Sequence, residues 1–379
     1  MSRILVVTRN YPPLWGGMER LNLNMVEQLA VQHEVMLVAP TGAEGHVPDG
    51  VEVRRTAGGR LSRFLVSATL HSLREARRFR PEIVLGGSGL VAPIVLAAAR
   101  LCGARSCVYA HGLDLAVPHR LYQAAWLPAI RAMDRVIVNS SATRDLALGK
   151  GVPTERIGIV HPGVDVPSED RAARARFRTL HQLGEGPILL SVGRLTARKG
   201  LREFVGQVLP EVVSKHPTVI LVVVGDAPTD ALYARVQTIE SIREEAERVG
   251  VAANVRFLGK RFGQELRDAY FGSDVHVFPV QELAGDPEGF GMVAVEAAAH
   301  GLPTVAYASG GVVDAIAEGR SGHLIPPGRA AQFAECVNQL LAHPVAPRRV
   351  IAFAGRFAWS QFGARIHQNL NDVHIKERP

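Results

Sequence analysis

The chain has 379 residues, of which 47% are apolar, with 37 glycines and 23 prolines. This composition excludes a disordered or fibrous protein, and the length predicts two domains because one hydrophobic core rarely serves so long a chain. The formal net charge is +7, and residues 1–165 carry most of it, with 19 Lys and Arg against 13 Asp and Glu. The first half therefore favours anionic partners, which include phosphorylated ligands, an anionic membrane and nucleic acid.

The three cysteines, Cys102, Cys107 and Cys336, form no zinc-binding pattern and indicate reduced thiols. The first residues, MSRILVVTRN, predict a short strand rather than a signal peptide, and the apolar run at 90–99 is too short to span a membrane. We therefore expect a cytoplasmic protein, with peripheral attachment to the inner face of the cell membrane as an open alternative.

Short β-rich runs alternate with helical patterns along the whole chain. One set begins with RILVVT and a second with PILLSV, and the runs in both are apolar on both faces. This alternation predicts an α/β fold with two parallel sheets covered by helices. The polar, charged stretch at 164–186 indicates a linker between the two sets. We expect domains at 1–165 and 166–355, followed by a terminal segment at 356–379.

The loop after RILVVT contains two glycines just before a predicted helix. Pro12 and Pro13 end the strand, Gly16 and Gly17 follow, and the helix is expected to begin near Met18. Free amides and the helix dipole at such a position can bind an anion, and ligands of doubly wound sheets bind at the carboxyl ends of strands. A plain turn with a helix cap explains the same residues equally well.

A second loop, GRLTARKG, follows the strand PILLSV. Arg194 and Lys199 lie five residues apart, between this strand and a helix expected to begin near Leu201. Both cations could bind a diphosphate at the carboxyl end of the strand. Two solvated surface cations are the alternative, and the position between strand and helix favours the functional interpretation.

The segment GDPEGFGMVAVEAAAHGLP at 285–303 repeats this arrangement of strand, loop and helix. Glu288 lies in the loop and Glu296 about two turns inside the predicted helix. The Glu288 carboxylate can accept hydrogen bonds from ligand hydroxyls, and the amides of Gly289, Phe290 and Gly291 can donate them. The alternative, in which Glu288 stabilises the helix dipole and Glu296 is solvated, leaves the glycines unexplained.

His111 directly follows the strand SCVYA, so we expect its side chain at the ligand-binding edge of the first sheet. A structural histidine is the alternative. The nearby segment 87–92, GSGLVA, matches a loose dinucleotide-binding pattern, but no acid ends the next strand as that motif requires. A nicotinamide site is therefore not expected, and no P-loop sequence is present to indicate ATP-driven chemistry of that type.

Taken together, these motifs resemble the retaining glycosyltransferases of family 4, which have the GT-B fold. The matching elements are Pro12-Pro13 with Gly16-Gly17 and Glu19, then His111-Gly112, Gly193-Arg194, Lys199-Gly200 and Glu288-x7-Glu296. They run in the family's order through nearly the whole chain. The resemblance implies two facing Rossmann-like domains with parallel sheets and an interdomain cleft. The first domain would bind the acceptor and the second the nucleotide sugar, and the terminal helix would cross back to the first.

The resemblance also implies roles for the donor-binding residues. Arg194 and Lys199 would hold the diphosphate, helped by the amides of Gly16 and Gly17. Glu296 would hold the ribose hydroxyls.

The other implied contacts concern the transferred sugar and the base. Glu288 and the amides that follow it would hold sugar hydroxyls, His111 would contact that sugar near the reacting carbon, and base contacts would come from around Gly259 and Lys260. No carboxylate stands out as a nucleophile for double displacement, and the family is described by same-face attack assisted by the leaving phosphate. No cofactor and no metal are expected, because no convincing D-x-D motif is found.

Residues 285–322 most resemble bacterial mannosyltransferases that use GDP-mannose, including those acting on phosphatidylinositol mannosides. A UDP-sugar or GDP-rhamnose remains an open alternative for the donor. Residues 60–80 hold six Arg against one Glu beside an approximate apolar helical face. They predict a helix that either rests on an anionic membrane or packs normally with a solvated basic side. We expect a lipid-linked or polysaccharide acceptor in cell-envelope glycan or lipopolysaccharide synthesis, with a soluble acceptor as the alternative.

Two other functions are compatible with the same fold. A nucleotide-sugar epimerase would convert the donor without an acceptor. A non-catalytic binding module would keep Arg194, Lys199 and Glu296 but would tolerate the loss of His111 and Glu288, and all five residues are present. Nucleic-acid binding is not expected, because the chain has no recognition motif or aromatic stacking platform.

Overall fold

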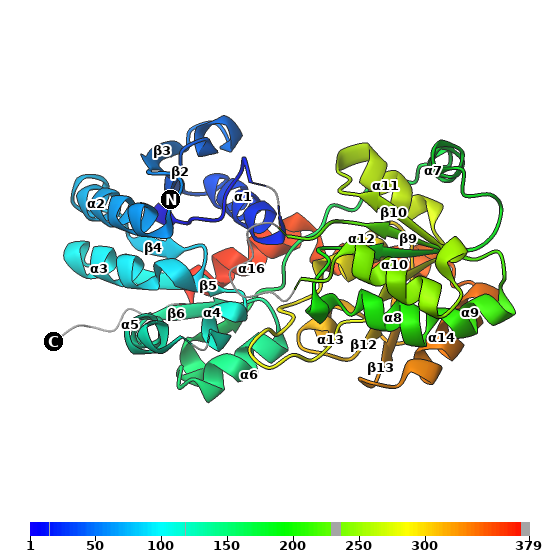
Figure 1. Ribbon diagram of the computed structural model, residues 1–379. Coiled ribbons are helices and arrows are strands. Elements are labelled where there is room, and N and C mark those ends of the chain that lie inside the picture. The colour runs from blue at the N-terminus through cyan, green and yellow to red at the C-terminus, as the bar shows by residue number, and fades with distance from the viewer. Residues whose placement is uncertain (15, 118, 229–235, 373–379) are drawn as a thin grey trace. The chain divides into compact units, whose positions relative to one another are not determined.

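The computed structural model describes residues 1–14, 16–117, 119–228 and 236–372. Contacts between Cα atoms divide the chain into two compact units, one formed by Met1–Gly163 with Trp359–Pro379 and the other by Val164–Ala358. The chain therefore leaves the first unit, builds the second, and returns to the first with its last helix (Figure 1).

The first unit is built on a parallel sheet of seven strands in the order β3-β2-β1-β4-β5-β6-β7. Its interior strands are apolar on both faces, as expected for a sheet covered on both sides. The strands are β1 (Arg3–Val7), β2 (Glu34–Pro40), β3 (Glu52–Thr56), β4 (Ile83–Gly86), β5 (Arg105–Ala110), β6 (Arg135–Val138) and β7 (Ile157–Ile159).

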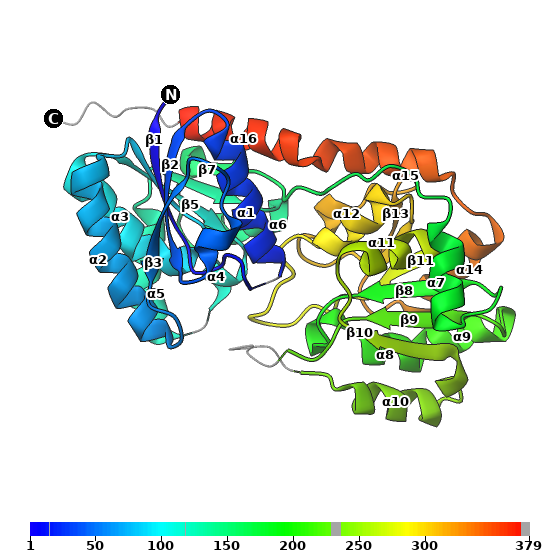
Figure 2. The ribbon, with the colours of Figure 1, turned by 90° about the horizontal axis from the view of Figure 1, so that it is seen from above.

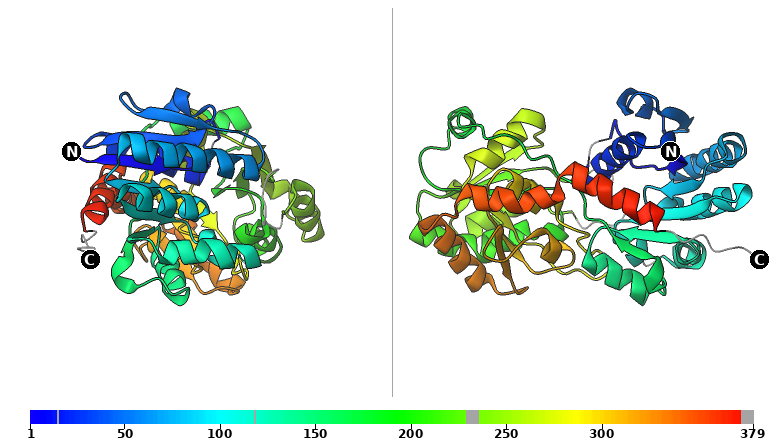
Figure 3. Two further views of the ribbon diagram at one scale, coloured as in Figure 1. Left: turned by 90° about the vertical axis from the view of Figure 1, so that its left-hand side faces the viewer. Right: turned by 180° about the vertical axis from the view of Figure 1, so that it is seen from behind.

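Helices cover both faces of this sheet. On one face α2, α3 and α5 lie side by side (Figure 3, left), and on the other α1 contacts α16 (Figure 2). The α-helices are α1 (Gly17–Ala30), α2 (Leu61–Phe79), α3 (Ala92–Cys102), α4 (Leu113–Ala116), α5 (Arg120–Arg131), α6 (Ser141–Gly149) and α16 (Trp359–Asn371). Short 3₁₀ turns are η1 (Ala43–His46), η2 (Gly89–Val91) and η3 (Thr154–Arg156). The helices predicted near Met18 and over 60–80 are confirmed as α1 and α2.

The second unit has a parallel sheet of six strands in the order β10-β9-β8-β11-β12-β13. The strands are β8 (Ile188–Val192), β9 (Ile220–Val224), β10 (Val255–Gly259), β11 (Val275–Phe278), β12 (Thr304–Tyr307) and β13 (Gly322–Ile325). The first helices are α7 (Ala173–His181), α8 (Leu201–Gln207), α9 (Leu209–Lys215), α10 (Ile239–Arg248) and α11 (Gly263–Gly272). The remainder are α12 (Met292–Ala299), α13 (Val312–Ala315), α14 (Ala330–Ala342) and α15 (Pro347–Ala354), with 3₁₀ turns η4 (Ala197–Lys199), η5 (Ala252–Asn254) and η6 (Gly355–Phe357).

The strand order places a topological switch point in each sheet. In the first unit the chain runs outward in opposite directions from β1 and β4, and in the second from β8 and β11. Loops that follow the two strands at such a point diverge and leave a crevice at the carboxyl edge, where ligands of open α/β sheets bind. The loops after β8 and β11 contain Lys199 and Glu288, so the topology brings the predicted donor residues together.

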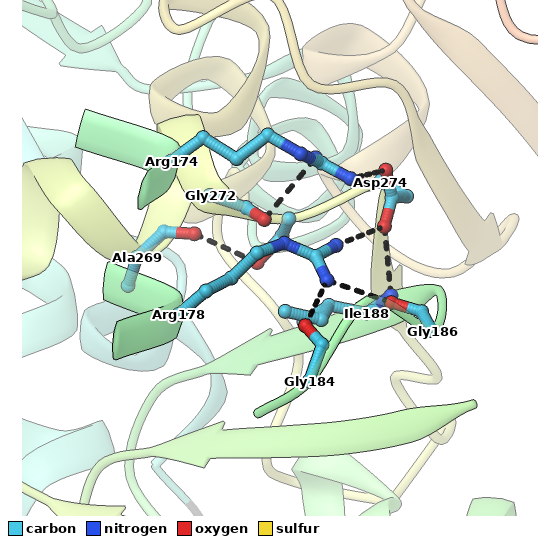
Figure 4. Close-up of polar contacts among 9 residues, drawn as sticks. Arg174, Arg178, Gly184, Gly186, Ile188, Ala269, Gly272 and Asp274 are labelled. Atoms are coloured by element: carbon cyan, nitrogen blue, oxygen red, sulfur yellow. Dashed lines mark hydrogen bonds and ion pairs between the residues drawn. The ribbon is translucent and has the colours of Figure 1, made fainter. Parts of the chain in front are cut away.

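Part of the predicted linker at 164–186 is the helix α7, which is tied to the second unit by arginines (Figure 4). Arg178 is 8% exposed and donates to the carbonyls of Gly184 and Gly186 at 2.7 and 2.9 Å. Both Arg178 and Arg174 pair with Asp274, whose Oδ2 also accepts the amide of Ile188 at the start of β8 (Figure 4). The segment reads as a linker in sequence because the helix is mostly charged: only Ala173 and Phe177 are buried apolar residues on it, and arginine pairs add to their contacts.

Candidate active site

The loop after β8 is fixed by backbone contacts with the loop after β9. Gly193 donates its amide to Val224 at 2.9 Å, and the Leu195 amide donates to Asp226 at 3.0 Å. A Cβ on Gly225 would collide with the Gly193 carbonyl, so both loops need glycine at their crossing. These contacts hold the short turn η4, which ends at Lys199.

Glu288 lies at the centre of a compact group of charges. Its Oε2 accepts from Lys199 Nζ at 2.7 Å and also pairs with Arg198 Nη1. Arg198 Nε lies 3.1 Å from Asp286 Oδ1, so two cations from one loop interleave with two carboxylates from the other. Only 10% of the Arg198 side chain, 17% of Lys199 and 12% of Glu288 are exposed. The group is therefore shielded from solvent, where charge pairs act more strongly than at an open surface.

The cations determine the ionisation of Glu288. Burial by itself would raise the pKa of Glu288, but Lys199, Arg198 and Arg194 outweigh burial and lower the pKa to about 2. Burial lowers the pKa of Lys199, with further lowering from Arg198 and Arg194, while Glu288 opposes the shift. Three cations and a direct hydrogen bond from Lys199 stabilise the ionised carboxylate. Glu288 is ionised at neutral pH.

The backbone that follows Glu288 is supported by a glycine pair after β12. The amide of Gly311 donates to the Glu288 carbonyl at 2.8 Å. A Cβ on Gly310 would lie 2.5 Å from that carbonyl oxygen, and a Cβ on Gly311 would collide with the carbonyl of Gly289. The glycines at these positions let two loops touch through their backbones, which fixes the predicted amide donors.

The three predicted amide donors differ in their surroundings. Phe290 is 2% exposed and its ring packs 5.7 Å from that of Phe357, so its side chain belongs to the core. Gly291 has φ of 90° and caps α12, where a Cβ would lie 2.9 Å from the Phe278 ring. Gly291 is therefore required by its backbone conformation and close packing, and the Phe290 side chain lies in the core, so the backbone amides of 289–291 are their only proposed donors.

Glu296 lies in the second turn of α12, as predicted, and is already engaged within the protein. Its Oε2 accepts the hydroxyl of Tyr270 at 2.8 Å. His300 stacks on the Tyr270 ring at 4.9 Å, and its Nδ1 bonds to the Glu296 carbonyl at 2.7 Å. Tyr270 thus fixes the Glu296 carboxylate from the neighbouring helix α11.

The remaining predicted residues of the second unit lie at loop surfaces. Arg194 is exposed, and its charge contributes to the lowered pKa of Glu288. Gly259 ends β10 with φ of 69°, and its carbonyl accepts the amide of Gly225 at 2.9 Å. Lys260 follows it and is exposed.

In the first unit, hydrogen bonds fix both the backbone and the ring of His111. Its amide donates to Asp114 Oδ2 at 2.9 Å, and its ring Nε2 lies 2.9 Å from the carbonyl of Gly87. A carbonyl only accepts, so Nε2 carries a proton and donates this hydrogen bond. The ring also packs 5.0 Å from Tyr109. His111 is thus held at the carboxyl edge of the first sheet, where it was predicted.

The glycines at 87 and 89 have a packing role. A Cβ on Gly87 would collide with Thr8 and Asn22, and a Cβ on Gly89 would collide with Asp114. The G-x-G pattern therefore lets β4 approach the loops after β1 and β5.

Gly16 is the N-cap of α1, Gly17 is its first residue, and both are exposed. A Cβ on Gly16 would lie 2.5 Å from Glu19 Oε2, and Glu19 Oε1 accepts from Asn10 Nδ2 at 2.8 Å. The Glu19 carboxylate thus lies beside the helix N-terminus that was predicted to bind an anion. Its negative charge partly neutralises the positive potential of this helix end.

Comparison with known proteins agrees with this geometry. Residues 186–343 match the family described as Glycosyl transferases group 1, and residues 15–167 match Glycosyltransferase Family 4. A GDP-mannose-dependent alpha-(1-6)-phosphatidylinositol monomannoside mannosyltransferase of Mycolicibacterium smegmatis is 30% identical over 97% of this chain and 98% of its own. The chain is a family 4 glycosyltransferase.

Further relatives support the family and the fold. A D-inositol 3-phosphate glycosyltransferase of Mycobacteroides abscessus is 31% identical over 60% of this glycosyltransferase and 49% of its own chain. The crystal structure of HepE from Anabaena with UDP and glucose superposes with a TM-score of 0.78 at 19% identity, covering 98% of this chain and all of that one. The fold of this glycosyltransferase is GT-B, with two Rossmann-like domains.

Two members of the charge group of this glycosyltransferase were not predicted from sequence. Arg198 stands directly before Lys199, and Asp286 stands two residues before Glu288. Lys199 was selected as a cation in the loop between a strand and a helix, but this position gave no reason to assign Arg198 a role as well. The available signal was the matched pair of motifs, ARK in one loop and DPE in the other, which places alternating charges on both sides of the switch point.

Two findings concern membranes and metals. In the described part of this glycosyltransferase, no helix has the length and apolar character needed to cross a membrane. Within the same residues, no three His, Cys, Asp or Glu side chains lie close enough together to hold a metal ion.

Proposed function

We propose that this glycosyltransferase transfers mannose from GDP-mannose to a lipid-linked or polysaccharide acceptor in cell-envelope synthesis. The observation that carries the proposal is the pairing of Lys199 with Glu288 at the switch point of the second sheet. A cation suited to a diphosphate and an acid suited to sugar hydroxyls lie side by side there. GDP-mannose as donor rests on the relative from Mycolicibacterium smegmatis, whose name specifies it.

The proposed donor contacts follow from the loops around this pair. Lys199 and exposed Arg194 bind the diphosphate, Glu288 accepts from sugar hydroxyls, and Glu296 accepts from the ribose. Gly259 and Lys260 lie at the end of β10, where contacts with the base are proposed. From the first unit we propose Gly16 and Gly17 as amide donors to the diphosphate and His111 as a contact of the transferred sugar.

The proposed chemistry depends on charge. As the bond from sugar to phosphate breaks, negative charge builds on the diphosphate and positive charge on the sugar ring. Lys199 and Arg194 stabilise the first, and Lys199 does so more strongly because its side chain is shielded from water. We propose retention of the anomeric configuration by attack on the face that the diphosphate leaves, without a metal ion. The leaving diphosphate then takes the proton from the acceptor hydroxyl.

The helix α2 supports a membrane-bound acceptor. Its outer side exposes Val66 and Leu70, at 63% and 66%, together with Arg63, Arg74 and Arg77. An apolar groove of about 220 Å³ lies beside Val66 and is lined in part by Ile94 and Trp126. Apolar side chains flanked by arginines suit the interface of an anionic bilayer. We propose peripheral contact with the inner face of the cell membrane through α2.

A second function is favoured by one relative. The D-inositol 3-phosphate glycosyltransferase is similar over 60% of this chain, and its name specifies a small phosphorylated acceptor. In that case the donor could be a UDP-sugar, and α2 would pack normally with a solvated basic side. An epimerase on the same fold would use the donor site without any acceptor. Neither alternative requires a nucleic-acid partner.

A nucleotide-release assay tests these proposals. Purified protein is incubated with GDP-mannose, UDP-glucose or UDP-N-acetylglucosamine, with and without anionic lipid extract, and with and without a chelator. The proposal predicts GDP release that requires lipid, is unchanged by the chelator, and gives a mannosylated lipid with the α-configuration. UDP release with inositol 3-phosphate would establish the second function, and isomerised donor without nucleotide release would establish the epimerase.

A further inference from the structure

The two oxygens of the Glu288 carboxylate have different environments. Lys199 Nζ and Arg198 Nη1 both contact Oε2. Within the described residues, Oε1 has no hydrogen-bond partner. One oxygen is therefore saturated by two cations, while the other keeps its full capacity to accept hydrogen bonds.

Arg198 has the geometry of a residue that positions Glu288. Its guanidinium spans two carboxylates: Nε forms an ion pair with Asp286 at 3.1 Å, without hydrogen-bond geometry, and Nη1 bonds to Glu288. A planar guanidinium contacted along two edges has little freedom to turn. Its side chain is 10% exposed, so this arrangement is enclosed by the protein. Asp286 thus fixes Arg198, and Arg198 fixes the orientation of the Glu288 carboxylate.

We propose that Arg198, held by Asp286, is a positioning residue that orients Glu288 so that Oε1 accepts from hydroxyls of the transferred sugar. This inference rests on the proposed function, in which Glu288 binds the sugar and Lys199 the diphosphate.

Two simpler roles for Arg198 fit the contacts less well. As a diphosphate ligand it would have to leave two carboxylates, whereas Arg194 is exposed and already available. The Arg198 side chain is also not needed simply to hold the two loops together. The backbone already does this, because the Gln281 amide donates to the Arg198 carbonyl at 2.8 Å. The backbones of the same two loops also touch at Gly200. A Cβ at this position would collide with the carbonyl of Pro279.

The experiment measures the affinities of GDP and GDP-mannose by titration calorimetry, together with Tm, kcat and KM for mannose transfer. The variants are Arg198→Gln, Arg198→Lys and Asp286→Asn. Glu288→Gln is included to measure how much the Glu288 carboxylate contributes to the affinity for GDP-mannose relative to GDP. The matched control is Arg202→Gln, since Arg202 lies on α8 nearby, is half exposed, and pairs with Glu245 at 3.5 Å.

A positioning role predicts that Arg198→Gln lowers the affinity for GDP-mannose relative to GDP by roughly tenfold, the loss expected for one charge-assisted hydrogen bond. Its GDP affinity should stay within about twofold of wild type, and Arg198→Lys should recover part of the loss. Asp286→Asn should also lower the affinity for GDP-mannose relative to GDP, without changing the affinity for GDP itself. Arg202→Gln should change none of these quantities.

Three results would overturn the inference. Equal losses for GDP and GDP-mannose in Arg198→Gln, or tighter GDP binding in Asp286→Asn, would make Arg198 a diphosphate ligand. A lower Tm with an unchanged ratio of affinities would make it purely structural. If Glu288→Gln shifts the ratio but the Arg198 and Asp286 variants do not, the inference fails while the proposed function stands. If Glu288→Gln leaves the ratio unchanged, the proposed role of Glu288 fails first.

Discussion

Lys199 Nζ lies 2.7 Å from Glu288 Oε2, although the two residues are 89 positions apart in the chain. They meet because β8 and β11 are neighbours in the sheet and both loops leave its carboxyl edge. Within this pair, the charge of Lys199 is balanced by the charge of Glu288. A diphosphate must therefore share Lys199 with Glu288, which links binding of the phosphate to the position of the sugar-binding acid.

Replacing Glu288 by Gln is expected to separate phosphate binding from sugar transfer. The amide keeps the shape but loses the charge that Lys199 and Arg198 share. We expect kcat/KM for mannose transfer to fall by roughly 10- to 100-fold, the value of a charge-assisted hydrogen bond. GDP should bind at least as tightly as to wild type, because Lys199 loses its anionic partner.

Steady-state kinetics and calorimetry with GDP measure both effects. Glu335→Gln is the control, because Glu335 is 53% exposed and pairs with Lys215 at the surface. A parallel loss of GDP affinity in Glu288→Gln would show that the carboxylate maintains the phosphate site rather than binding sugar.

A methyl group at Gly311 is expected to damage the site more than the fold. The new Cβ would meet the Gly289 carbonyl and displace the loop that carries Glu288. We expect Gly311→Ala to reduce transfer by at least about tenfold, because small displacements of a positioned group are costly in catalysis. Gly355→Ala is the control, since a Cβ there has nothing within 4 Å. Equal activity in the two variants would mean that the loop relaxes without loss.

The cluster in Figure 4 predicts a large loss of stability when Asp274 is removed. Arg178 is 8% exposed and would keep its charge without its carboxylate partner. Burial of an unpaired charge costs about 3 kcal/mol, so Asp274→Ala should lower the free energy of unfolding of the second unit by about this amount. Glu335→Ala, which breaks an exposed pair, should cost under about 0.5 kcal/mol. Denaturant titration would contradict this account if the two variants unfold alike.

The buried His276 predicts a loss of stability in mild acid. Its side chain has 0% exposure, and burial lowers its pKa to about 3, with Lys199 adding to and Glu296 opposing the shift. A histidine with a depressed folded pKa is neutral in both states above about pH 6.5. Below that pH the unfolded chain gains a proton that the folded chain resists, so stability falls until the pH reaches the folded pKa.

Between pH 7 and pH 5, His276 should therefore lower the free energy of unfolding by about 2 kcal/mol. Unfolding curves at the two pH values measure this loss, and in His276→Phe the difference should shrink by a similar amount. An unchanged pH difference in the variant would assign the acid sensitivity to other groups.

The sequence predicted the architecture well, because parallel strands apolar on both faces and loops ending in Gly or Pro leave clear patterns. Lys199 and Glu288 could be placed at one edge of the sheet for the same reason, since each follows a strand and precedes a helix, and the structure brings them into contact. Arg198 was missed because its role depends on a partner in another loop, which periodicity does not reveal. The helix α7 was taken for linker because its sequence is mostly charged, with only Ala173 and Phe177 buried among its apolar residues, and its pairing with Asp274 is a tertiary feature.

Transfer of radiolabelled mannose from GDP-mannose to anionic lipid extract would show whether Lys199 and Glu288 form the donor site of a mannosyltransferase. The comparison is between wild type, Lys199→Ala and Glu288→Gln, all at matched folded concentration. The account predicts a labelled lipid product with wild type and at least about tenfold less with each variant, since each loses a contact to the donor. Full transfer by both variants, or no transfer from GDP-mannose by wild type, would contradict it.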